Sequence, residues 1–75
     1  MNNSKLVFIV DDEPAITRLL SYYIKEKWLY RIEVFSNGED VLKSLQNKPD
    51  LVLLDIMLPG LDGIEVLRRI KLYDD

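Results

Sequence analysis

LVFIVDDEP, residues 6–14, is the stretch of the chain that decides the fold. Its first five residues form an unbroken run of β-branched, aliphatic and aromatic side chains, which is typical of a parallel strand covered on both faces. Pro14 suits the first turn of a helix, because the N–H that proline lacks would have no partner there. Apolar residues then recur with helical spacing at Ile16, Leu19, Leu20, Tyr23 and Ile24. The stretch therefore predicts a buried strand over 6–10 and a helix over 14–27.

A second strand and helix are predicted in the next part of the chain. Residues 31–35 alternate polar and apolar side chains, which favours a shorter strand with one wetter face at the edge of a sheet. Ser36 and Glu39 have the S-x-x-E spacing of a capping box, in which two side chains bond free N–H groups at the start of a helix. The apolar stripe of this helix is formed by Val41, Leu42 and Leu45.

The last third of the chain repeats the pattern. Residues 51–54, LVLL, are a strand that is apolar at every position, and Asp55 ends it. Asp62 suits the N-cap of a third helix. Three residues of that helix are expected to face the core: Ile64, Leu67 and Ile70. Three βα units favour an α/β fold with a parallel sheet and right-handed crossovers, and two central-type strands with one edge-type strand predict the spatial order 2-1-3.

Length and composition limit the function. The 75 residues suffice for a single domain, residues 1–75, and they include no cysteine and no histidine. This excludes Ser-His and Cys-His catalytic pairs and the common zinc sites. A net charge of −3 argues against a nucleic-acid partner for this chain. The opening apolar run is too short for an export signal or a membrane span, so we expect a cytoplasmic protein with no membrane contact.

Three aspartates are the candidate chemical groups. Asp11 and Asp12 follow the first strand and Asp55 follows the third. Because the carboxyl ends of neighbouring parallel strands meet at one edge of a sheet, these carboxylates should converge in one pocket. They repel one another unless a cation neutralises them, and oxygen ligands alone favour Mg²⁺ or Mn²⁺. A carboxylate held beside such an ion could attack a phosphoryl group and form an aspartyl phosphate.

Two segments closely resemble the receiver domain of bacterial two-component response regulators: VDDEP at residues 10–14 and LLDIMLPGLDG at residues 53–63. The D-x-x-x-P-x-x-D-G spacing of the second is specific in that setting, and the resemblance extends from Lys5 to about Leu72. It implies a flavodoxin-like parallel sheet. It also implies a signalling domain, rather than an enzyme, that accepts a phosphoryl group. A sensor histidine kinase or a small phosphodonor supplies that group.

The resemblance also implies a role for each site residue. Asp55 is the phosphoryl acceptor, and Asp12 and Asp55 bind Mg²⁺ directly. Asp11 acts on the ion mainly through water, and the backbone carbonyl of Met57 completes the protein ligands. Two residues are expected to shape the loop after the acceptor: Pro59 and Gly60.

The chain also departs from the family's pattern. A flavodoxin-like receiver has five strands in the order 2-1-3-4-5, which at about 25 residues per unit requires roughly 125 residues. The family's hydroxyl residue and lysine lie at the ends of strands four and five. Nothing here replaces them, because Thr17 lies inside the first helix and Lys48 and Lys71 lie far from the pocket. We therefore expect a truncated receiver, lacking the last two strands, that is impaired in phosphotransfer.

An open sheet edge predicts a partner. The strand over 51–54 has the composition of a central strand but lacks an outer neighbour in this chain, and an unpaired apolar edge is a template for association. Part of the apolar stripe of helix 14–27 is open as well. We expect a homodimer through these two elements, arranged about a two-fold axis.

Two other functions remain open from the sequence. The chain could be a non-enzymatic homodimerising assembly module in which the acidic pocket is a relic. It could also be a Mg²⁺-dependent phosphatase with an aspartate nucleophile, because Asp11 and Glu13 have the spacing of that family's acids after the first strand. The second is disfavoured, since nothing like the further motifs of those phosphatases follows.

Some residues have simpler structural explanations. Asp11 or Asp12 could be a plain helix N-cap, although the pair together with Asp55 favours a site. Residues 28–30, Trp-Leu-Tyr, are predicted to be a packing corner between helix and strand. Tyr22 and Tyr23 are expected to be one exposed and one buried ring of the first helix.

Overall fold

The computed structural model of the 75-residue chain describes residues 5–57 and 63–74. Strands and helices alternate along it, as the hydrophobic pattern predicts. The elements, in order, are β1 (Leu6–Val10), α1 (Pro14–Trp28), β2 (Arg31–Phe35), α2 (Gly38–Lys43), the 3-10 helix η1 (Leu45–Asn47), β3 (Leu51–Leu54) and α3 (Gly63–Asp74). The helix predicted over 14–27 is therefore one residue longer, and Asp62 lies outside the described residues.

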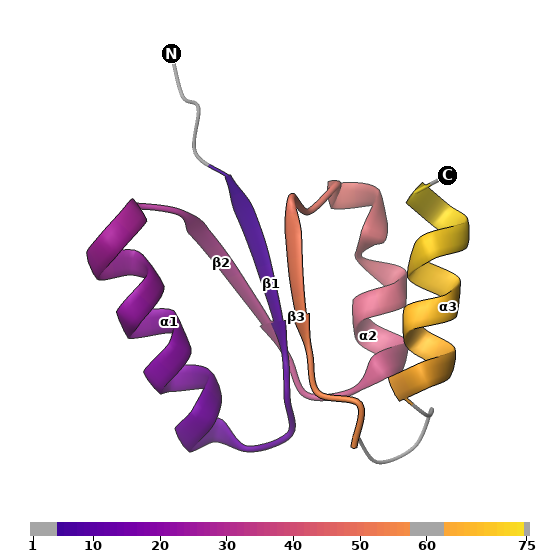
Figure 1. Ribbon diagram of the computed structural model, residues 1–75, viewed down its shortest axis with the longest axis horizontal. Coiled ribbons are helices and arrows are strands. Elements are labelled where there is room, and N and C mark those ends of the chain that lie inside the picture. The colour runs from indigo at the N-terminus through magenta and orange to yellow at the C-terminus, as the bar shows by residue number, and fades with distance from the viewer. Residues whose placement is uncertain (1–4, 58–62, 75) are drawn as a thin grey trace.

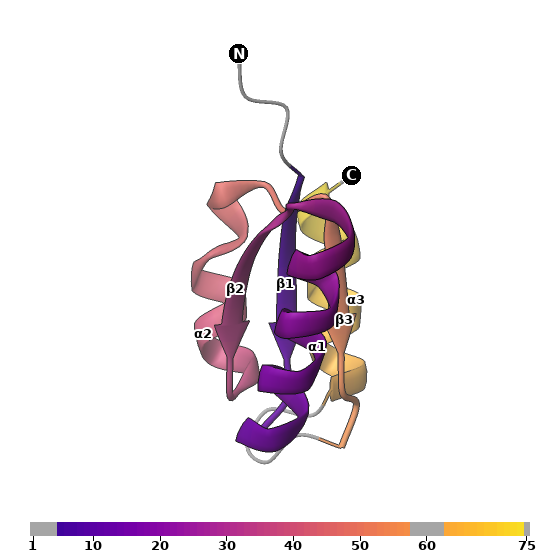
Figure 2. The same ribbon diagram turned by 90° about the vertical axis from the view of Figure 1, so that its left-hand side faces the viewer.

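The three strands form a parallel sheet in the order β2-β1-β3, which confirms the predicted topology. The central strand β1 ends level with its neighbours, because Val10 pairs with Phe35 on one side and Leu54 on the other. Helix α1 covers one face of the sheet, and α2 and α3 lie on the other (Figures 1 and 2). None of the described helices is long and apolar enough to cross a membrane.

The core is built on both faces of β1, whose five residues are all buried. Alternate side chains point to opposite faces of a strand, so β1 contributes to two clusters. Val7 and Ile9 pack with Ile24 of α1. The other β1 residues pack with the buried side chains of α2, η1 and α3, which are Val41, Leu45 and Val66.

Helix α3 presents a different face to the core from the one predicted. Ile64 and Leu67 were expected inside, but both are exposed, whereas Val66 is fully buried and Ile70 is half-buried. Gly63, Val66 and Ile70 have the i, i+3, i+7 spacing of one helix face. The backbone at Gly63 is packed tightly in the structure, and this fixes which face turns inward.

Helix α2 begins one residue later than the predicted capping box. Its N-cap is Asn37, whose side-chain oxygen accepts a hydrogen bond from the backbone N–H of Asp40 at 2.8 Å. The Asn37 amide in turn donates to the Asp40 carboxylate at 3.1 Å. The prediction of Ser36 as the cap is wrong because Asn37 and Asp40 form the same kind of reciprocal pair and compete for the same helix start.

The turn from α1 into β2 also differs from prediction. Tyr30 packs against the core and Trp28 stacks on it, as expected of a packing corner. Leu29 does not pack there: the residue is 82% exposed and its backbone is left-handed, with φ 56°. The two neighbouring tyrosines, Tyr22 and Tyr23, are both exposed, so the expectation of one buried ring is wrong as well. This end of the molecule therefore presents more apolar surface than packing alone requires.

Asp50 fastens the start of β3 to the start of β1. Its backbone N–H donates to the carbonyl of Leu6, and its carboxylate accepts from the backbone N–H of Leu6, both at 2.8 Å. We expect Asp50→Ala to lower the free energy of unfolding by about 2 kcal/mol, because it removes a charge-assisted hydrogen bond to the backbone N–H of Leu6, which is buried. Urea unfolding measures the loss. Asp50→Asn, which keeps an acceptor oxygen, is the matched control, and equal losses in the two variants would contradict this role.

Candidate functional site

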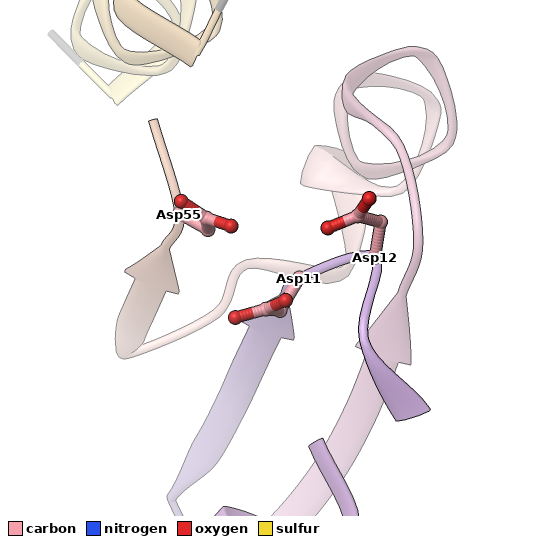
Figure 3. Close-up of side chains that lie close together, drawn as sticks. All are labelled: Asp11, Asp12 and Asp55. Atoms are coloured by element: carbon pink, nitrogen blue, oxygen red, sulfur yellow. The ribbon is translucent and has the colours of Figure 1, made fainter. Parts of the chain in front are cut away.

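Three carboxylates converge at the carboxyl end of the sheet. Asp11 and Asp12 follow β1 and Asp55 follows β3, and one oxygen from each lies within 4.8 Å of the others. Figure 3 shows Asp12 and Asp55 extending toward each other from the ends of neighbouring strands, with Asp11 between their backbones. Asp11 and Asp55 are half-buried and Asp12 is exposed. The structure thus brings together the three acids that the strand order predicts.

Backbone hydrogen bonds hold two of these aspartates in place. The Asp11 N–H donates to the carbonyl of Phe35 at 3.0 Å, and the Asp55 N–H donates to the carbonyl of Val10 at 2.9 Å. Each side chain is fixed in turn, since one Asp11 oxygen accepts from the Glu13 N–H and one Asp55 oxygen accepts from the Met57 N–H, both at 2.9 Å. The hydrogen bonding between strands therefore continues one residue past the ends of β1 and β3. It holds both carboxylates at the carboxyl ends of these strands.

Helix capping does not explain these acids. The N-cap of α1 is Glu13, and no side chain forms a cap hydrogen bond there. The Asp11 carboxylate bonds the N–H of Glu13 itself, two residues further on, which is a turn rather than a cap. Neither Asp11 nor Asp12 therefore has the simple role of a plain N-cap.

The donor set fits a hard divalent cation. Every ligand atom on offer is a carboxylate oxygen, and the described residues contain no nitrogen or sulfur ligand beside them. The carboxylate oxygens of Asp11 and Asp55 that accept backbone N–H groups leave the second oxygen of each residue available. Met57 lies in the same loop, two residues after Asp55, with an exposed side chain. Pro59 and Gly60, which were also assigned to this loop, lie outside the described residues.

A hollow of about 520 Å³ opens beside the acids, between α1 and β3. Aliphatic side chains make up most of its wall, and the acids Asp11, Glu13 and Asp55 stand at one end. Among the described residues that line it there is no lysine, serine or threonine. The end of the hollow beside Asp55 therefore offers carboxylate oxygens, and its described lining includes no positively charged side chain.

Comparison with known proteins identifies the family. The model of the response regulator receiver domain matches residues 7–75. The chain belongs to this family. It is 45% identical to the alkaline phosphatase synthesis transcriptional regulatory protein PhoP of Bacillus subtilis over 69 aligned residues. The aligned region covers 91% of this chain and 28% of PhoP.

Two further relatives show how much of a receiver protein the chain spans. Sporulation initiation phosphotransferase F of Bacillus subtilis is 42% identical over 76 residues, which is 100% of this chain and 60% of that protein. The solved N-terminal domain of a response regulator receiver protein from Methanoculleus marisnigri superposes with a TM-score of 0.80 at 40% identity, over 88% of this chain and 54% of that one. The chain thus spans about half of a solved receiver domain.

Gly63, which enters the sequence analysis only as the end of the D-x-x-x-P-x-x-D-G motif, lies against the backbone that follows Asp55. A Cβ atom built on Gly63 would lie 2.3 Å from the Cα and 2.6 Å from the carbonyl oxygen of Ile56. The first turn of α3 therefore touches the backbone of the residue after Asp55, an approach that only glycine permits. The D-G pair at 62–63 is the sequence signal that could have indicated this contact.

The two arginines of α3 are paired within their own helix. The Glu65 carboxylate accepts from Arg68 Nε at 3.0 Å and from Arg69 Nε at 2.8 Å. These bonds, from Arg68 first and Arg69 second, lower the pKa of Glu65 to about 2. Both arginines are exposed, which suits a solvated helix face of the receiver rather than a nucleic-acid contact.

Proposed function

We propose that this receiver domain accepts a phosphoryl group on Asp55. The observation that supports this most is the position and hydrogen bonding of the Asp55 carboxylate. One oxygen is fixed by the Met57 N–H, and the carboxylate stands beside two further acids at the point where neighbouring strands end. A carboxylate that is already oriented loses less conformational freedom when it attacks a phosphoryl donor.

The reaction forms a phosphorus–oxygen bond to Asp55 and breaks either the phosphorus–nitrogen bond of a phosphohistidine, releasing the histidine, or the phosphorus–oxygen bond of an acyl phosphate, releasing the carboxylate. An Asp55 oxygen donates an electron pair to phosphorus, and the bond to the leaving group breaks with its electron pair. The donor is a sensor histidine kinase or a small phosphodonor such as an acyl phosphate. Asp11, Asp12, Asp55 and the backbone carbonyl of Met57 would hold Mg²⁺, which offsets negative charge on the carboxylates and the phosphoryl oxygens.

We expect phosphotransfer by the 75-residue chain to be slow, and the chain to act as a phosphoryl acceptor rather than an enzyme with its own turnover. The hollow beside Asp55 is lined by acids and aliphatic side chains, with no lysine or hydroxyl residue among its described lining. Donors aimed at the transferring group supply much of the rate enhancement of such reactions, and each is worth about a hundredfold or more.

Incubation with acetyl phosphate and Mg²⁺, followed by intact-mass spectrometry, tests the acceptor. The expected product is a small fraction of protein that has gained one phosphoryl group and that disappears when Mg²⁺ is chelated. Asp55→Asn should gain none. Glu26→Gln, which changes an exposed carboxylate of α1, should behave as the parent protein. A phosphoryl group that persists in Asp55→Asn would contradict the assignment.

We also propose that the 75-residue chain self-associates through β3 and α1. Among the described residues β3 pairs with β1 alone, so its outer edge has free N–H and C=O groups. Hollows flank this strand on both faces: the one described above and another of about 530 Å³ between β3, η1 and α3. A second copy of the strand, related by a two-fold axis, would pair with the free N–H and C=O groups of this edge.

Sedimentation velocity at tens of micromolar protein tests the association. The chain should sediment as a dimer, and Leu51→Lys should shift it toward the monomer, because a charge on the exposed edge opposes strand pairing. Leu72→Lys, at an exposed position of α3, is the control. A parent protein that is monomeric and unfolds cooperatively would contradict the dimer. A dimer that responds to neither Mg²⁺ nor phosphodonor would instead favour an assembly module with a relic pocket.

A further inference from the structure

The turn from α1 into β2 forms an exposed aromatic corner, made of Tyr23, Trp28, Leu29 and Tyr30. The Trp28 ring stacks on Tyr30 with centroids 5.9 Å apart and an interplanar angle of 16°, and Tyr23 meets Trp28 edge-on at 6.3 Å. The rings support one another, yet Tyr23 is 54% exposed and Trp28 is 50% exposed. The corner lies at an outer edge of the molecule, at the end opposite the aspartates (Figure 1).

Leu29 at the tip of this corner ends α1 as a left-handed C-cap whose N–H donates to the carbonyl of Lys25, but the cap does not explain why the residue is a leucine. Its φ of 56° places it in the left-handed region, where glycine or asparagine is favoured and leucine costs about 1 kcal/mol. Its side chain gains little from burial in return, since 82% of it is exposed. A large apolar side chain held in a strained position and facing outward is a reason to look for a function.

Positive charge surrounds the corner. Lys27 Nζ lies 5.5 Å from the centroid of the Tyr23 ring, Lys25 lies in the last turn of α1, and Lys5 precedes β1. Within the described part of the chain, none of these three lysines forms an ion pair. The acidic site is about 16 Å away along β1, which exceeds the Debye length of about 8–10 Å. Two acids lie at this end as well, Glu26 between the two lysines of α1 and Asp50 bonded to Leu6, so the three lysines leave a small local excess of positive charge despite the net charge of −3.

The shape of the corner selects among anionic partners. The corner projects from the molecule, and the residue at its tip, Leu29, is 82% exposed. A projecting apolar tip with flanking amines suits a soft surface that is apolar inside and anionic outside. We propose that the aromatic corner binds the surface of an anionic phospholipid bilayer. Leu29 and Trp28 enter the headgroup layer and the lysines contact lipid phosphates.

Contact with a bilayer surface requires no membrane-spanning segment. The expectation of no membrane contact rested on the lack of such a segment in the sequence, so it does not apply to a surface contact. Tryptophan and tyrosine are enriched at the level of the lipid headgroups. Their rings have an apolar body that contacts lipid and a polar N–H or O–H group that stays hydrated.

Co-sedimentation with vesicles of phosphatidylserine and phosphatidylcholine tests the proposal. The protein should bind these vesicles and not vesicles of phosphatidylcholine alone, and binding should weaken as salt is raised. Trp28 is the only tryptophan, so its emission reports on the corner directly and should shift to the blue on binding. Because one lysine near an anionic surface changes affinity about fivefold, the double variant Lys25→Glu with Lys27→Glu should lose binding at least 25-fold.

Leu29→Asn separates binding from folding. Asparagine tolerates the left-handed backbone, so this variant should be at least as stable as the parent while binding vesicles about tenfold more weakly. Leu72→Asn, which removes an exposed leucine of α3, should leave binding unchanged. Equal binding by the parent and Leu29→Asn would overturn the proposal. So would equal affinity for vesicles and for soluble polyglutamate, which would indicate an acidic protein partner instead.

Discussion

Gly63→Ala is expected to lower the free energy of unfolding by about 3 kcal/mol, the upper end of the usual range for overpacking. The added methyl carbon would lie 2.3 Å from the Cα of Ile56 and 2.6 to 2.7 Å from its carbonyl group. These are backbone atoms, so no side-chain rotation relieves the overlap. For a domain of 75 residues this loss lowers Tm by on the order of 15 °C.

Thermal unfolding followed by circular dichroism measures this effect. Leu72→Ala is the matched control, because it introduces the same residue into an exposed position of the same helix and should change stability by less than about 1 kcal/mol. Ile56 follows Asp55 directly, so the clash should also disturb the acceptor loop and weaken any response to Mg²⁺. A Gly63→Ala protein with the stability of the parent would mean that α3 and the loop move apart easily.

Asp12→Asn is expected to raise the stability of the metal-free protein and to reduce the further gain in stability that Mg²⁺ gives. In the absence of the ion, three carboxylates with oxygens within 4.8 Å repel one another by about 1 kcal/mol per pair in a water-like medium. Removing one charge should therefore stabilise the metal-free protein. With Mg²⁺ at ten times its Kd, the parent should gain about 1.4 kcal/mol, while a variant that binds tenfold more weakly gains about 0.4 kcal/mol.

The measurement is a pair of melting curves, with EDTA and with millimolar Mg²⁺, for each protein. Glu26→Gln provides the control for the loss of one exposed carboxylate away from the site, and it should keep the full response to Mg²⁺. A parent protein that shows no change in Tm with Mg²⁺, or an Asp12→Asn protein that shows the same change, would contradict the proposed metal site.

The strands and their order followed from the sequence because burial on both faces leaves a distinctive pattern. β1 is apolar at all five positions and buried at all five, and β2 alternates and lies at an edge. Once the order is known, the ends of β1 and β3 must be neighbours. The meeting of Asp11, Asp12 and Asp55 is then a matter of topology, which is why it could be predicted without a structure.

The errors arose where tertiary contacts decide between similar local patterns. Two apolar stripes are possible in α3, and the approach of Gly63 to Ile56 selects the one that contains Val66. Asn37 and Ser36 are both good helix caps, and only the partner at Asp40 distinguishes them. No feature of the neighbouring sequence predicted that Leu29 is exposed, since apolar residues between a helix and a strand are most often buried.

The burial of β1 has a consequence for how the protein is made. β1 pairs with β3 only after a long separation, since Leu6 and Asp50 are 44 positions apart. At ~5–20 residues per second, a ribosome adds β3 several seconds after β1. During that time LVFIV is an uncovered segment of the kind that aggregates, with Lys5 before it and Asp11 and Asp12 after it. Charged residues that flank such a run keep it from pairing with other chains. We expect the aspartates of the acidic site to oppose such pairing in the nascent chain before the site itself exists.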